Sequence, residues 1–296
     1  MHLYLKIQPE RHTYLPMHSH FKSILFGIFI SKAMGIGTQF LAIPTSAYDL
    51  IYFNSPWRNP ATLSHVNKVP ELGLAYGNWL AGIETVGFKW RGQVSSGSGG
   101  LDIRYVGISD IELRPSKPTV EPLGYYSAYG ISARGITSWA RGPFQFGIGL
   151  NLVGVQIYQE STSGIAFDLG WGWSISENIK FTLSALNLGR MNKLKTVAPE
   201  LPQRVISSVS LDQSNFSVFF AAESNSLAKD PIFYSGGNGR YNNLIFGGTA
   251  MITKGVKYLS GGMGVQFGIY AVTYGFQWGD QHLGMPQMID ISIRLP

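Results

Sequence analysis

The side chains that could carry acid–base or metal chemistry are few in this sequence. Of its six histidines, only His65 and His282 lie beyond the first 33 residues. His282 belongs to the run Asp280-Gln281-His282, in which an acid and a base stand together. Glycines flank this run, and it lies in a loop between two strand-like segments. Polar residues are expected in such a loop whether or not they have a catalytic role. Ligand type alone leaves open a metal site that joins both histidines to Asp49 or Asp280.

The motifs offer no support for nucleophilic or phosphate-binding chemistry. The chain has no cysteine, and none of its serines stands in a G-x-S-x-G elbow. The run Gly97-Ser98-Gly99-Gly100 lacks the Gly-Lys-Ser/Thr of a phosphate-binding loop, so we interpret it as a hairpin turn. We therefore predict a protein that is not an enzyme and that has no metal and no cofactor.

From Leu72 onward the sequence alternates between large apolar residues and small or polar ones. Because successive side chains of a strand point to opposite faces, such alternation predicts strands with one apolar wall and one small, polar wall. The clearest segment, 165–175, has its large residues on one face: Ile165, Phe167, Leu169, Trp171, Trp173 and Ile175. The other face of that segment carries Ala166, Asp168, Gly170, Gly172 and Ser174.

A soluble β-sandwich shows the same alternation as a membrane β-barrel. The face that carries the small or polar residues distinguishes the two. In a sandwich that face is solvated and often charged, whereas here it is mostly Gly, Ser, Thr, Ala, Gln and Asn, as in a crowded polar lumen. Charged residues make up only 14% of the chain. Aromatic residues also gather at segment ends, where membrane-interface girdles lie: Trp79, Trp90, Tyr105, Tyr158 and Trp278. We predict a transmembrane antiparallel β-barrel of the all-β class.

Thirteen candidate strands can be counted, and bacterial single-chain barrels have even numbers. We predict about 14 strands, with 12 as the alternative, and place the missing strand within 105–125 or 125–142. Short links alternate with longer ones at 109–124, 190–203, 225–240 and 279–286. This asymmetry is typical of short periplasmic turns and longer outer loops.

The N-terminus resembles a secretory signal. Lys22 precedes the apolar run Ser23–Ile30, and small residues at 31 and 33 fit a cleavage site. The run is too short to cross a bilayer as a helix. We predict a signal peptide at 1–33, a plug or lumenal segment at 34–71 and an outer-membrane β-barrel at 72–296.

The stretch Gly37–Ser64 is apolar but does not alternate, and its prolines prevent one continuous helix. We expect it to lie inside the barrel as a plug. The plug candidates are Phe40, Leu41, Pro44, Trp57, Arg58, Asn59 and Pro60. The lumen candidates are Asp168, Lys180, Asp290 and Arg294, which carry charge on the small-residue faces.

The net charge of +6 could suggest nucleic acid as a partner. Of the 23 basic and 17 acidic residues, four basic and one acidic precede Met34, so 19 and 16 remain and the net charge falls to +3. No cluster of Lys and Arg that could follow phosphates remains. We predict outer-membrane lipid, and no nucleic acid, as a partner.

Three blocks resemble the PorV/PorQ family of outer-membrane proteins, which is related in fold to the FadL fatty-acid channel. The first is QFLAIPTSA (39–47) followed by RNPATLS (58–64). The second is SALNLGRMNKLKTVAPELPQRV (184–205), and the third begins at Tyr274 with YGFQWGDQHLGMPQMIDISIRLP.

This resemblance implies a fourteen-stranded barrel with an N-terminal plug in the bacterial outer membrane. It also implies a docking or shuttle role in type IX secretion, with cargo C-terminal domains or attachment-complex subunits as partners. The alternative is a FadL-like passive channel for hydrophobic solutes, with a kink or lateral opening in its wall. A third hypothesis, an outer-membrane hydrolase, depends on His282.

Overall fold

The computed structural model describes residues 37–65, 69–94, 97–115, 120–279 and 284–295. Within these residues fourteen antiparallel strands close into a barrel in which each strand pairs with its sequence neighbours and β1 pairs with β14. The signal-peptide prediction lies outside the described residues. The strands are β1 (Glu71–Asn78), β2 (Glu84–Val94), β3 (Gly97–Leu113), β4 (Gly124–Arg141), β5 (Phe144–Ile157), β6 (Glu160–Ser174), β7 (Ile179–Met191), β8 (Arg204–Asp212), β9 (Phe216–Asn225), β10 (Ile232–Tyr241), β11 (Leu244–Thr253), β12 (Val256–Phe267), β13 (Tyr270–Gly279) and β14 (Gln287–Arg294).

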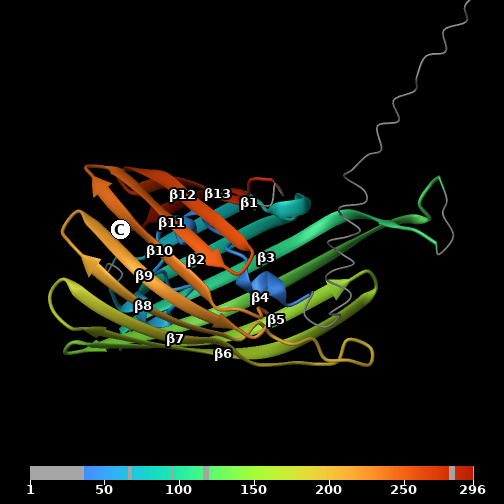
Figure 1. Ribbon diagram of the computed structural model, residues 1–296, viewed down its shortest axis with the longest axis horizontal. Coiled ribbons are helices and arrows are strands. Elements are labelled where there is room, and N and C mark those ends of the chain that lie inside the picture. The colour runs from blue at the N-terminus through green and yellow to red at the C-terminus, as the bar shows by residue number, and fades with distance from the viewer. Residues whose placement is uncertain (1–36, 66–68, 95–96, 116–119, 280–283, 296) are drawn as a thin grey trace, which may run out of the picture. The chain divides into compact units, whose positions relative to one another are not determined.

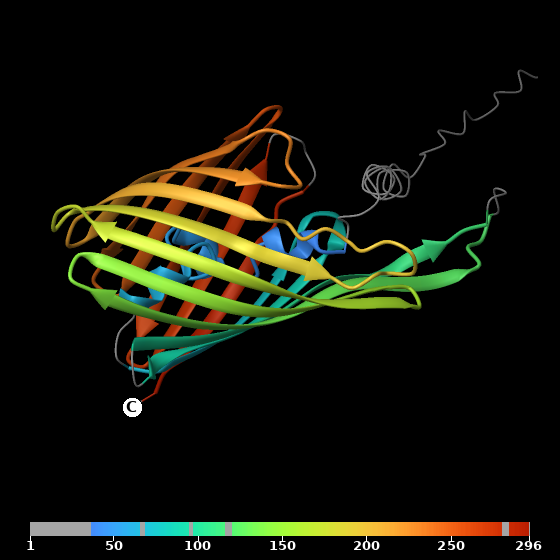
Figure 2. The same cartoon turned by 90° about the horizontal axis from the view of Figure 1, so that it is seen from below.

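The two ends of the barrel differ in the length of their connections. At the end where β1 begins, strands are joined by short links such as 142–143, 213–215 and 268–269, and we call it the short-turn end. The opposite, long-loop end carries 114–123 and 192–203. Figures 1 and 2 show the β3–β4 hairpin extending beyond its neighbours at the long-loop end. The asymmetry expected from the sequence is present.

The large residues of the strands face outward, as the alternation predicts. Phe167 and Leu169 of β6 are about half exposed, whereas Ala166 and Asp168 between them are buried. The same division holds on β5, where Leu152 is 57% exposed and its neighbour Val153 only 3%. An exterior of this kind would be costly in water and is favourable in hydrocarbon.

Three details of the sequence prediction are wrong. The strand missing from the count is β10, which lies in the segment 225–240 that we interpreted as a loop. Between outward Phe233 and Tyr241 its outward positions are Ser235, Gly237 and Gly239, so the middle of the strand lacks the large residues that mark the other strands. The Gly97–Gly100 run opens β3 instead of forming a turn. Trp79 packs against a cluster of inward residues at Ala47, instead of lying in an exterior girdle.

The stretch before β1 lies inside the barrel and is broken into short helical pieces, as Figures 1 and 2 show. These are η1 (Gln39–Ala42), α2 (Ala47–Ile51) and η2 (Pro60–His65); a further turn, η3 (Leu80–Gly82), links β1 to β2. Among the described residues no helix is long and apolar enough to cross a membrane. We call residues 37–64 the lumenal segment.

Glycines of the inner wall make room for this segment. A Cβ atom at Gly147 would overlap the backbone of Pro60 and Ala61, and one at Gly130 would overlap the ring of Phe40. The inner wall therefore carries small residues because the lumenal segment packs directly against the backbone of the strands.

Candidate functional site

The lumenal segment buries its large residues in three apolar clusters against the wall. Phe40 and Leu41 pack against β3, β5 and β7, and Val153 belongs to this cluster. Phe53 stacks on Phe219 at 4.6 Å between ring centres and lies 4.9 Å from Tyr234. Leu50 packs with Met288 of β14. The apolar residues of the segment thus pack against inward apolar residues of the strands. These inward residues are exceptions to the polar pattern of the wall.

Arginines of the wall bind backbone carbonyls of the lumenal segment. The Arg104 guanidinium of β3 donates to the carbonyls of Phe40, Leu41 and Ile43. Arg134 of β4 donates to the carbonyl of Pro56 at 2.9 Å. A segment with so little regular structure leaves many carbonyls without helical partners, and buried carbonyls need donors. These arginines supply them.

The Asn59-Pro60-Ala61 turn joins the segment to β6 and β7. The Asn59 side-chain oxygen accepts from the Ala61 N–H at 2.9 Å, so Asn59 caps η2, and Pro60 occupies the first helical position. The Asn59 amide group donates to the carbonyls of Trp171 and Leu183 at 3.1 and 3.3 Å. One side chain therefore both begins η2 and binds two neighbouring strands.

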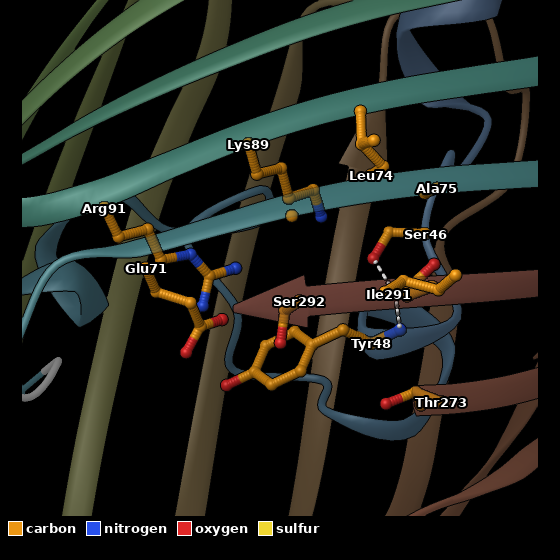
Figure 3. A pocket seen from close by; sticks show the side chains of 12 residues that line it. Ser46, Tyr48, Glu71, Leu74, Ala75, Lys89, Arg91, Thr273, Ile291 and Ser292 are labelled. Atoms are coloured by element: carbon orange, nitrogen blue, oxygen red, sulfur yellow. Dashed lines mark hydrogen bonds between the residues drawn. The ribbon is translucent and has the colours of Figure 1, made fainter. Parts of the chain in front are cut away.

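Asp290 of β14 caps the helix α2 from outside the segment. Its carboxylate accepts from the Ser46 hydroxyl at 2.6 Å and from the N–H groups of Ala47 and Tyr48 at 2.9 and 2.8 Å. Figure 3 shows the bonds made by Ser46 and Tyr48 beside a small pocket of about 50 Å³ into which Lys89 and Arg91 of β2 point. The pocket is small and its lining includes four charged side chains and several hydroxyls beside a few apolar residues, so it suits water rather than an apolar molecule.

An ion pair holds the other side of α2. Lys89 Nζ lies 2.6 Å from Asp49 Oδ2, and both groups are largely buried. Burial by itself raises the pKa of the Asp49 carboxyl, but Lys89 and then Arg91 outweigh it and keep that pKa below its ordinary value of 3.8. Because the folded-state pKa is lowered, the pair contributes stability at neutral pH that is lost only as the pH falls below that value.

Replacing Asp290 with alanine is expected to loosen the start of α2. Three donors lose their acceptor, and each buried unsatisfied group costs about 1–3 kcal/mol. Hydrogen exchange at the Ala47 and Tyr48 amides, measured by mass spectrometry, should become faster. Asp290→Asn keeps one acceptor oxygen and should show a smaller effect, whereas Glu112→Gln, at an exposed pair with Arg114, should show none. Unchanged exchange in Asp290→Ala would mean that other contacts hold α2.

A second charged group lies around Trp57. The guanidinium carbons of Arg58, Arg104 and Arg204 lie 4.5, 5.6 and 5.0 Å from its ring centre. Arg204 makes a bidentate pair with Glu223 at 2.7 and 2.9 Å, and the Tyr234 hydroxyl donates to the same carboxylate at 2.9 Å. These groups are almost fully buried, so they rely on one another for compensation of charge.

The lining of the lumen changes from one end of the barrel to the other. A cluster of inward apolar residues, among them Val106, Val155 and Met191, lies toward the long-loop end, and the buried Arg204–Glu223 pair lies at the same end. The short-turn end has inward charges in their place, including the pairs Lys180–Asp212 and Arg294–Glu71. An apolar solute would therefore find its favourable surface at the long-loop end.

The structure gathers most of the site residues named from the sequence. The plug candidates Phe40, Leu41, Pro44, Trp57, Arg58, Asn59 and Pro60 are all buried in the lumen. Asp290 contacts them through α2, and Asp168 contacts them through Arg134, whose Nε lies 2.5 Å from its Oδ2. Lys180 and Arg294 lie apart from the segment's contacts described above, at the short-turn end.

Sequence reasoning missed Arg104, Arg134, Arg204 and Glu223. Each stands at an inward position of its strand, so a charge on the small-residue face was the available signal. His65 ends η2, while the Asp280–His282 run lies outside the described residues. Among the described residues no three His, Cys, Asp or Glu side chains gather as a metal site would require.

The closed barrel of fourteen antiparallel strands, with short helical turns inside it, has the fold of FadL-like outer-membrane barrels. No family model matches the chain, and no curated protein matches it either. The resemblance to PorV/PorQ therefore stays a prediction.

Particular solved structures share this fold at low sequence identity. The Pseudomonas putida toluene transporter TodX superposes with a TM-score of 0.58 at 12% identity, over 88% of this chain and 95% of that one. A TodX mutant described as a monoaromatic hydrocarbon channel gives 0.58 at 10% identity, over 89% and 100%. A FadL homologue of Pseudomonas aeruginosa gives 0.57 at 11% identity, over 84% and 98%.

Proposed function

We propose that this protein is a non-enzymatic, passive channel for hydrophobic solutes in the bacterial outer membrane. The observation that carries the proposal is the cluster of inward apolar residues toward the long-loop end, in contrast to the inward ion pairs at the short-turn end. The transport named for TodX supports the proposal by analogy of fold.

The apolar lining is covered by the lumenal segment, and Phe40 is one of the segment's closest contacts with it. The Phe40 ring belongs to the cluster of Val153 and Val155 and lies so close to Gly130 that a Cβ atom there would collide with it. We infer that an aromatic solute takes a place beside or instead of this ring. Displacement of the lumenal segment would then open the path, so the segment acts as the plug of the channel.

The proposal is tested by locating a bound solute. Crystals of the barrel grown with toluene should show it among Val106, Val153 and Met191, and Phe40→Ala should increase its occupancy because the removed ring leaves an apolar cavity. Phe219→Ala is the matched control, because it removes a ring from the cluster around Phe53. It should leave the occupancy of toluene among Val106, Val153 and Met191 unchanged. Absence of toluene from the lumen in both the native protein and Phe40→Ala would contradict the proposal.

A docking role in type IX secretion is the second candidate, carried by the resemblance to PorV/PorQ. The observation in its favour is that the described lumen is filled by a well-anchored segment, as a barrel without transport would allow. A tagged barrel should then recover secreted cargo domains or attachment-complex subunits from cells. Recovery of neither would count against docking and leave the channel proposal untouched.

A further inference from the structure

The outer wall of the barrel is hollowed over β2–β6. The hollow has a volume of about 540 Å³, and its lining includes Gly99, Gly135 and Thr137, with Ile148 and Leu150 on one side. Gly135 faces outward, since it pairs with outward-facing Leu101 and Leu150, and a Cβ there would meet nothing within 4 Å. Small residues on an otherwise large-residue exterior therefore leave a furrow open to hydrocarbon. We call it the β4 furrow.

An outward cation stands on the same strand, beyond the furrow. Arg141 ends β4 at the short-turn end, pairs with outward-facing Phe144 and is exposed. The ion pairs of the described residues do not include it. Trp139 lies between Arg141 and the furrow and stacks on Phe146, as an aromatic residue at a membrane interface would.

The spacing matches one leaflet of a bilayer. Six residues separate Gly135 from Arg141, which is about 20 Å along a strand. At a tilt of about 40° this becomes about 15 Å along the membrane normal, half of a hydrocarbon core of about 30 Å. If Arg141 lies at the phosphate level, Gly135 lies near the midplane.

We propose that the β4 furrow binds one glycerophospholipid of the leaflet at the short-turn end, with an acyl chain in the furrow and its phosphate at Arg141. The apolar furrow accounts for the chain, and the exposed guanidinium accounts for the anionic headgroup. The proposal requires the barrel to lie in a membrane, but it does not depend on which solute the lumen carries.

Native mass spectrometry of the purified barrel in micelles, titrated with dipalmitoyl phosphatidylglycerol, tests the proposal. The native protein should retain one lipid at low lipid concentration. Gly135→Leu fills the β4 furrow and should weaken lipid binding roughly tenfold. Displacing about two methylene groups of the acyl chain from the furrow is enough for this effect. Arg141→Gln should weaken it roughly fivefold, and Arg141→Lys should restore most of the binding.

Two variants serve as matched controls. Ala250→Leu adds bulk at an outward position of β11, and Arg190→Gln removes an outward arginine of β7 at the long-loop end. Both should bind as the native protein does, and the mobility shift of unheated samples in electrophoresis verifies that every variant folds.

Retention of the lipid by Gly135→Leu overturns the acyl-chain site, and retention by Arg141→Gln overturns the headgroup site. Equal loss in the two control variants would mean ordinary annular lipid and would also overturn the proposal. Displacement of the lipid by inorganic phosphate alone would reduce the site to a simple anion contact.

Discussion

Deleting Gly37–Trp57 is expected to leave a folded barrel that leaks small sugars. The barrel closes through the ladder between β1 and β14, to which the deleted stretch contributes no strand. Its removal uncovers inner-wall charges such as Arg104 and Asp290, which water can then solvate. Liposome swelling with a small sugar should change from background to rapid, because, in the part of the chain that the structure describes, the lumenal segment occupies the space that the strands enclose.

A deletion of similar kind outside the lumen provides the control. Residues 193–199 lie in the long-loop connection between β7 and β8 and are largely exposed, so their removal should leave swelling at background. A folded Gly37–Trp57 deletion with unchanged permeability would refute the plug assignment. Folding is verified for both deletions by the mobility shift of unheated samples.

Replacing Glu223 with leucine is expected to cost about 3–5 kcal/mol of the free energy of unfolding, because it leaves a buried cation without its partner. Arg204 and Glu223 have side-chain exposures of 3% and 2%, so water cannot replace the lost carboxylate. The Tyr234 hydroxyl loses its acceptor in the same variant. Urea unfolding of the barrel in vesicles, followed by tryptophan fluorescence, measures the change.

The double variant Glu223→Leu with Arg204→Met shows whether the stability loss of Glu223→Leu comes from the unpaired charge of Arg204 or from lost packing. Removing both charges should recover most of the stability, since a buried pair replaced by apolar residues is often neutral or stabilising. The exposed pair of Glu112 with Arg114 is the control, and Glu112→Gln should change stability by about 0–1 kcal/mol. A double variant as unstable as Glu223→Leu would show that packing or the Tyr234 bond dominates.

Most of the fold could be predicted because the membrane imposes the alternation on each strand separately. Phe167 and Leu169 must face hydrocarbon and Asp168 must not, so a single strand already reveals its two faces. The alternation failed in β10, where outward Gly237 and Gly239 carry no apolar side chain. There the neighbouring strands supply the order that its own sequence does not signal.

The site could be predicted only in part. The prolines and apolar residues of 37–64 showed that this stretch differs from the strands, and its buried position follows from those properties. The path of residues 37–64 through the lumen determines which residues of the wall contact them. Arg134 and Pro56 are 78 residues apart in sequence, and nothing local indicates that one donates to the other. Pairings of this kind appear only in three dimensions.

We propose that the barrel admits apolar solutes past its plug and excludes polar ones. Paired uptake of an aromatic hydrocarbon and a sugar of similar size, into vesicles containing the intact native protein, tests it most directly. The account predicts hydrocarbon uptake well above that of protein-free vesicles, which Phe40→Ala accelerates, and sugar uptake at background for both proteins. Hydrocarbon uptake equal to that of protein-free vesicles, with or without Phe40, would contradict it.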